Sequence, residues 1–185
     1  MQDMNLSRRR ISALVLVPLA LLLGAACNPL GPPKSTVASV DVERFSGTWY
    51  EVASIPQFFS VGLVNTTATY SLQPDGSIKV VNSGRYFTKD GPLSTITGSA
   101  VALDSTNSKL NVSFAGAPST TGPGNYWIVD LDPAYQWVIV SDPAGATGFL
   151  LTRTPEISPT LRAELLARAA AKGVDVDRMV TTPQN

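Results

Sequence analysis

The stretch that decides the fold, residues 64–87, reads VNTTATYSLQPDGSIKVVNSGRYF. Two β-prone runs, 64–73 and 77–87, flank the sequence Pro74–Gly76, in which every residue favours a tight turn. Two such runs joined by a short turn predict a β-hairpin. The stretch therefore indicates an antiparallel β protein.

The chain repeats this pattern on both sides of the hairpin. Turn residues such as Gly, Pro, Asp and Asn separate further predicted strands at 47–55, 93–103, 109–115, 125–131, 135–141 and 146–153. With the hairpin, these make eight consecutive strands. Such a meander forms either a sandwich or a closed barrel, and full closure alone removes the exposed edges. An eight-stranded barrel has an interior just wide enough for one small ligand.

The pattern changes after the eighth predicted strand. Ser158 can cap a helix that begins at Pro159, a residue favoured at the first helical position. Apolar residues then share one face at helical spacing: Leu161, Leu165, Leu166 and Ala169. Because Gly173 ends the pattern, we expect one helix over 159–172, packed on the outside of the barrel, and a short strand within 174–180.

The N-terminus has the features of an export signal. The basic residues Arg8–Arg10 precede an apolar run, Ile11–Leu23, and the small residues Gly24–Ala26 stand before Cys27. This order is typical of a secretory signal peptide. The apolar run is shorter than the roughly 20 residues of a transmembrane helix. We expect residues 1–26 to be a signal peptide, with the Sec and twin-arginine routes both open.

Cys27 is the sole cysteine, which excludes an intramolecular disulfide. The sequence LGAAC at 23–27 resembles the lipobox of bacterial lipoproteins, although Gly24 stands where that motif usually has Leu. The resemblance implies that Cys27 is acylated, whereas an ordinary signal peptide followed by a cysteine is the alternative. Residues 27–39, rich in Pro and Gly, are expected to be a linker, and 40–185 to form one domain.

The composition excludes several classes of function. Lys and Arg total 14, as do Asp and Glu, so the formal net charge is zero. The chain thus lacks the excess of basic residues that is typical of nucleic-acid-binding proteins. The chain has no histidine, the usual general base and the commonest metal and haem ligand. No phosphate-binding glycine loop occurs either. We expect no catalytic residues, no metal and no cofactor. Catalysis by carboxylate, Lys or Tyr side chains is the alternative that the composition does not exclude.

Motifs on the predicted strands resemble those of the lipocalin family. Gly47–Glu51 resembles the family signature G-x-W, and 68–76 resembles the second strand of bacterial lipocalins and apolipoprotein D. Residues 126–135 lie where the second family motif falls, and 150–155 resemble the third. The resemblance covers 40–179. It implies an all-β fold, an eight-stranded antiparallel up-and-down lipocalin barrel with one C-terminal α-helix packed outside.

The resemblance also implies how one end of the barrel is closed. In lipocalins the signature tryptophan, here Trp49, plugs that end, and the arginine of the third motif, here Arg153, packs over it. Strand side chains alternate between faces. This alternation groups Trp49, Glu51 and Ala53 on one strand, and Phe149, Leu151 and Arg153 on another. A guanidinium over an indole gains about 0.5–2 kcal/mol, so we expect a structural role for this pair.

The family likeness places a ligand pocket in the open mouth of the barrel. By this resemblance Tyr70, Asn82 and Phe149 point inward, and Phe149 replaces a tryptophan that is common there. Phe114 and Tyr126 are further candidates. Each aromatic residue has the alternative of being ordinary barrel core.

The family resemblance and the expected membrane tether imply a lipid ligand, and the few charges expected inside favour a neutral or weakly polar one. Glu51 is one of them, and the orientation of Lys79 is open. Phe58 and Phe59, in the long first loop, are candidates to gate the mouth or touch a membrane. We expect a fatty acid, lysophospholipid or similar amphiphile as ligand, with a lipid anchor on the outer side of the cytoplasmic membrane or on an outer membrane. A filled barrel with a structural or interaction role, and an enzyme on the same fold, are the alternatives.

Overall fold

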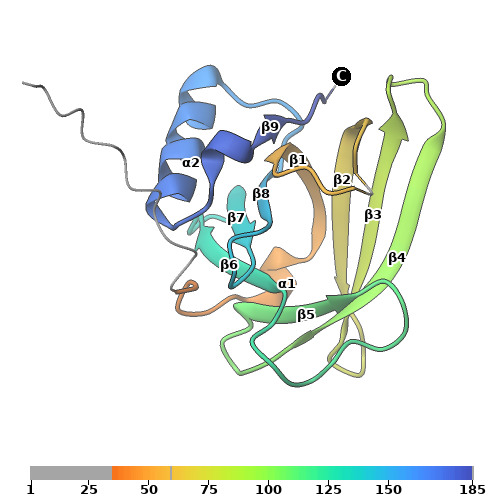
Figure 1. Cartoon of the computed structure of the whole chain (residues 1–185). Coiled ribbons are helices and arrows are strands. Elements are labelled where there is room, and N and C mark those ends of the chain that lie inside the picture. Colours follow the sequence, from red (N-terminus) through yellow and green to blue (C-terminus); the bar gives the residue numbers. More distant parts are fainter. Residues whose placement is uncertain (1–34, 59, 185) are drawn as a thin grey trace, which may run out of the picture.

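The computed structural model describes residues 35–58 and 60–184 (Figure 1). The predicted signal peptide, Cys27, most of the linker and Phe59 lie outside the described residues. Within the described ranges, no helix combines the length and apolar character needed to cross a membrane.

Eight antiparallel strands form a closed barrel. They are β1 Gly47–Ser54, β2 Leu63–Leu72, β3 Ile78–Tyr86, β4 Leu93–Ala102, β5 Lys109–Ser113, β6 Tyr126–Leu131, β7 Trp137–Ser141 and β8 Gly148–Thr152. Each strand pairs with the next, and β1 pairs with both β8 and β2. The predicted up-and-down barrel is therefore confirmed, and the sandwich alternative is excluded.

Left-handed backbone shortens two of the predicted strands. The strand predicted from Tyr135 begins at Trp137, because Tyr135 has a φ of 59° and its N–H donates to the Asp132 carbonyl in a turn. The strand predicted through Phe87 ends one residue earlier, because Phe87 has a φ of 68°. Neither φ is compatible with a strand.

Apolar side chains gather on both sides of the barrel wall, as the alternation of strand residues requires. The inner cluster lies toward the closed end and includes Phe45, Trp49, Val80, Val138 and Leu151. The outer cluster joins the wall to the helix α2 (Pro159–Ala171) and includes Val52, Ile139, Leu150, Leu165 and Ala169. The prediction of one helix packed outside the barrel is confirmed, and so is its Ser158 cap.

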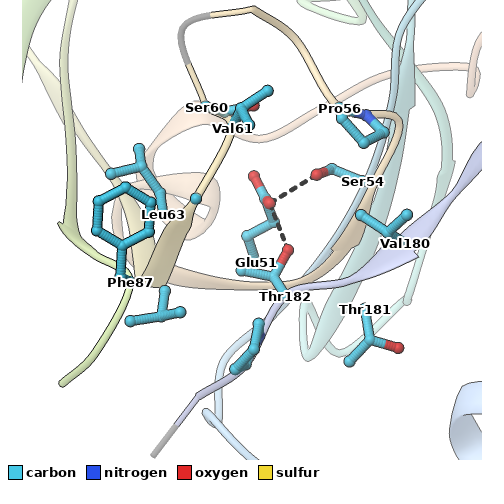
Figure 2. Close-up of a pocket in the computed structure, with 13 residues that line it drawn as sticks. Glu51, Ser54, Pro56, Ser60, Val61, Leu63, Phe87, Val180, Thr181 and Thr182 are labelled. Carbon is cyan, nitrogen blue, oxygen red and sulfur yellow. Dashed lines mark hydrogen bonds between the residues drawn. The ribbon is translucent and has the colours of Figure 1, made fainter.

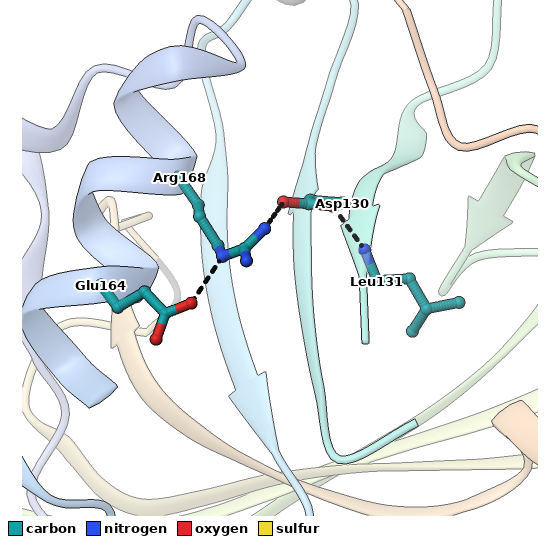
Figure 3. Close-up of polar contacts among 4 residues, drawn as sticks. All are labelled: Asp130, Leu131, Glu164 and Arg168. Atoms are coloured by element: carbon teal, nitrogen blue, oxygen red, sulfur yellow. Dashed lines mark hydrogen bonds and ion pairs between the residues drawn. The ribbon is translucent and has the colours of Figure 1, made fainter. Parts of the chain in front are cut away.

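Polar contacts also join α2 to the wall (Figure 3). Arg168 donates to Glu164 within the helix at 2.9 Å and lies 3.4 Å from the Asp130 carboxylate on β6. Its guanidinium is 5.0 Å from the centroid of the Trp137 ring. Exposed ion pairs are worth only about 0–1 kcal/mol. Burial of Leu165 and Ala169 therefore holds the helix, and Arg168 orients it.

A short helix that the sequence did not predict, α1 (Val42–Phe45), covers the closed end of the barrel. The Arg153 guanidinium lies 3.8 Å from the centroid of the Trp49 ring. It also donates to the carbonyls of residues 44–46 at 2.8 to 3.1 Å. The carbonyls at a helix C-terminus lack partners within the helix. Arg153 thus fixes helix, tryptophan and eighth strand as one unit.

A β-bulge in β1 changes which side chains face inward. The register of β1 against β8 shifts between Glu51 and Ala53. Glu51 stays on the inner side, whereas Ala53 joins Val52 in the outer cluster. The expectation that Ala53 shares a face with Trp49 is therefore wrong, since a bulge inserts one residue and reverses the alternation.

The C-terminal tail lies where β1 and β2 part. These strands pair only from Gly47 to Tyr50. Gln184 donates from Nε2 to the Glu51 carbonyl at 2.8 Å and to the Thr66 carbonyl at 2.9 Å. The strand predicted within 174–180 is instead a 3-10 turn, Val176–Arg178, followed by β9, Val180–Thr181, which pairs with β1. The tail thus bridges a gap in the barrel wall.

Replacing Arg153 tests the closed end. We expect Arg153→Ala to lower the free energy of unfolding by about 2–4 kcal/mol, because stacking on Trp49 and the bonds to residues 44–46 are lost. Arg178→Ala, at an exposed arginine, should change it by less than about 0.5 kcal/mol. Urea denaturation measures both. Ligand selectivity should stay intact, and a large loss of selectivity at unchanged melting temperature would contradict a structural role.

Candidate ligand-binding site

The barrel encloses a cavity of about 650 Å³. Seven strands and the loop after β1 line it, and α1 with the Arg153–Trp49 contact lies at the opposite, closed end. Pockets that bind small molecules measure about 300–1,000 Å³ and are mostly apolar. The wall is largely apolar and includes Leu63, Ala68, Val80, Ile96, Val112, Phe149 and Leu151.

All five residues proposed from the sequence as ligand contacts line this cavity: Tyr70, Asn82, Phe114, Tyr126 and Phe149. Tyr70 is also buried in the inner apolar cluster, and Tyr126 and Phe149 pack against it. These three aromatic side chains therefore belong both to the apolar core and to the wall of the cavity. Contact with a ligand stays a prediction for each of the five.

Tyr70 and Tyr126 form a neutral polar pair inside the barrel. Their hydroxyl oxygens are 2.8 Å apart, and their rings meet edge to face at 6.1 Å. Burial raises the pKa of Tyr70 to about 12 and holds the pKa of Tyr126 well above its usual value. Both phenols are therefore protonated at neutral pH, and one of the two hydroxyls donates to the other.

Asn82 contributes an acceptor that the protein leaves unsatisfied. Its Oδ1 is buried and has no hydrogen-bond donor in the described part of the chain. A buried group without a partner costs about 1–3 kcal/mol.

Glu51 is the one charged residue among the described residues that line the cavity. Its side chain is buried, and its Oε1 accepts hydrogen bonds from Ser54 at 2.7 Å and Thr182 at 2.6 Å. Burial raises the pKa of Glu51, and the two hydroxyl donors lower it in part. Lys79 is exposed between the buried Ile78 and Val80, so its side chain lies on the outside of the barrel.

Exposed apolar side chains surround the open end. Phe58, in the loop after β1, is 92% exposed and also lines the cavity. Val61, Phe87 and Leu93 are exposed at the same end. Gating or membrane contact by Phe58 stays a prediction, and Phe59 lies outside the described residues.

A second pocket, of about 410 Å³, adjoins the cavity at Glu51 (Figure 2). The loop after β1, Phe87 and residues 180–183 of the tail line it. Sequence reasoning missed this lateral pocket, because it depends on the tail lying between β1 and β2. Strand alternation puts Glu51 on the same face as Trp49, so the sequence could have predicted an inward-facing carboxylate. No motif in the sequence predicts that Thr182 lies next to it.

No group of three or more acidic or cysteine side chains in the described ranges is arranged to hold a metal ion.

A closed eight-stranded barrel with one blind end and an internal apolar cavity is the architecture of lipocalins. The chain belongs to this family, since the model of the lipocalin-like domain matches residues 40–184. It is 35% identical over 178 residues to the outer membrane lipoprotein Blc of Escherichia coli (strain K12), covering 95% of this chain and 98% of that protein.

More distant proteins share the family or the fold. The chain is 35% identical over 155 residues to temperature-induced lipocalin-1 of Arabidopsis thaliana, covering 80% of this chain and 82% of the relative. The crystal structure of the cockroach allergen Per a 4 matches with a TM-score of 0.60 at 18% identity, covering 84% of this chain and 96% of that chain. At this identity the likeness shows the fold alone.

The tyrosine pair can be tested with a double-mutant cycle. We expect Tyr70→Phe and Tyr126→Phe each to lower the free energy of unfolding by about 1–2 kcal/mol, because the remaining hydroxyl loses its partner. The double variant should lose much less than the sum, since no hydroxyl is then left unpaired. Tyr86→Phe, at the cavity mouth, is the control. Strictly additive losses in urea denaturation would show that the two hydroxyls do not support each other.

Proposed function

We propose that this protein is a carrier that holds one single-chain lipid, such as a fatty acid or a lysophospholipid, in its barrel. The observation that supports the proposal best is the cavity of about 650 Å³ with mostly apolar walls. A filled barrel with a purely structural role would leave no such space. Membership of the lipocalin family supports the same reading.

We also propose that the carrier is tethered in the cell envelope. Under this proposal residues 1–26 are removed, Cys27 is acylated, and 27–39 link the anchor to the domain at 40–185. The lipobox-like sequence at 23–27 supports this organisation, as does the likeness to proteins named outer membrane lipoprotein. Acylation with more than one chain gives stable anchoring.

We propose binding rather than catalysis as the activity. The chain has no histidine, and its sole cysteine precedes the barrel domain. The relatives reported above carry lipocalin or lipoprotein names, none of which denotes an enzyme.

Narrowing the cavity should weaken binding. We expect the protein to bind a fluorescent fatty acid or lysophospholipid saturably with one site per chain. Phe149→Trp should lower the affinity about five- to tenfold, because the larger ring takes space from the chain of the ligand. Leu72→Trp, at an exposed position near the closed end, is the matched control and should leave the affinity unchanged.

Fluorescence titration measures these affinities. If neither fluorescent amphiphile binds saturably to the unmodified protein, the carrier proposal fails. Equal weakening by the two tryptophan variants would place the binding site outside the barrel.

A further inference from the structure

One oxygen of the Glu51 carboxylate accepts hydrogen bonds from the described residues, and the other oxygen accepts none. Ser54 and Thr182 both donate to Oε1. Oε2 accepts no hydrogen bond within the described ranges, and Figure 2 shows it turned towards the side where Ser60 and Val61 lie. A buried carboxylate is costly unless a cation or further donors reach it.

The described part of the protein offers this oxygen no cation. Neither Lys nor Arg lines the barrel cavity or the lateral pocket. Arg162 of α2 lies behind β1 and donates instead to the Val52 carbonyl at 3.0 Å and the Thr181 hydroxyl at 3.3 Å. Tyr70 and Tyr126, inside the barrel, are phenols whose raised pKa keeps them neutral. No cation of the described residues therefore neutralises Glu51, and its second oxygen is left to a proton, to water or to the polar head of a ligand.

The charged group of the cavity, the Glu51 carboxylate, offers only acceptors. Oε2 of Glu51 accepts no hydrogen bond from the described residues. A ligand with N–H groups supplies the donors that this oxygen lacks. An ionised fatty acid would instead bring a second negative charge next to Glu51, and like charges in a buried site repel strongly.

The position of Glu51 leaves room for a head group. It lines both the barrel cavity and the lateral pocket of about 410 Å³, as do Ser60 and Leu63. A ligand can therefore keep its chain in the barrel and place a polar head at the carboxylate, with the rest of that head in the lateral pocket.

We infer that Glu51 binds the protonated amine at the head of a single-chain amphiphile whose apolar chain occupies the barrel cavity. The inference rests on the proposed carrier function and narrows it. An amine-bearing lipid becomes the preferred ligand, and a free fatty acid becomes a poor one.

The protonation state of Glu51 should make the affinity for each kind of ligand depend on pH. Burial raises the pKa of Glu51, so at a given pH the ligand-free protein is protonated there to a greater extent than an exposed glutamate would be. An amine binds the ionised form and releases that proton, which makes amine affinity rise with pH. A carboxylate ligand needs the protonated form as a donor, so its affinity falls as pH rises.

The test uses three ligands of equal chain length, dodecylamine, dodecanoate and dodecanol, below their aggregation concentrations. Displacement of the neutral dye Nile red from the full chain and from Glu51→Gln gives each affinity. At about pH 8 the ratio of amine to carboxylate affinity should be at least about tenfold higher for the unmodified protein than for the variant. On lowering the pH through the range in which Glu51 gains its proton, the ratio should fall toward that of the variant.

Variant proteins distinguish a failure of the amine-binding inference from a failure of the carrier function. Glu164→Gln, at an exposed carboxylate of α2, should leave every affinity unchanged. If the lipids bind but Glu51→Gln leaves the ratio unchanged, the inference fails and the carrier function stands. If none of the three displaces the dye, the carrier function itself fails.

A second variant keeps Glu51 in place. Thr182→Val removes one donor to Oε1, so it should raise the pKa of Glu51 further and shift the pH at which amine preference appears upward. An unshifted profile in a folded Thr182→Val protein would overturn the role of this carboxylate, even if Glu51→Gln did not fold.

Discussion

The contact on which the structure depends joins its eighth strand to its first. Arg153 stacks on Trp49 and donates to the Thr48 carbonyl at 3.0 Å and to the carbonyls at the end of α1. A guanidinium presents five donors in a fixed plane, and a lysine could not make these contacts together. Because this cluster blocks one end, the barrel interior becomes a blind cavity with a single mouth.

The gap between β1 and β2 gives this cavity its polar character. Bulges at Glu51 in β1 and near Asn65 in β2 part the strands, and the tail through Gln184 fills the opening. Thr182 reaches the Glu51 carboxylate across 131 residues of sequence. The gap thus connects the fold to the choice of ligand.

Local signals made most of the fold predictable. Turn residues such as Pro74–Gly76 mark the hairpins, and Ser158 marks the start of α2. The family resemblance placed Tyr70 and Asn82 in the wall. The remaining features are not local. Left-handed residues such as Tyr135, the bulge after Glu51 and the position of the tail depend on contacts between segments far apart in the chain. Sequence patterns with periods of two or 3.6 residues cannot encode such contacts.

The central claim is that the barrel holds a single-chain amphiphile with an amine at its head. Mass spectrometry of lipid extracted from the full-length protein, isolated in mild detergent from its own membranes, tests this claim most directly. The account predicts a single-chain, amine-bearing lipid in a ratio of about one per chain, enriched over the surrounding membrane. Recovery of free fatty acid as the enriched species, or of unselected two-chain phospholipids alone, would contradict it.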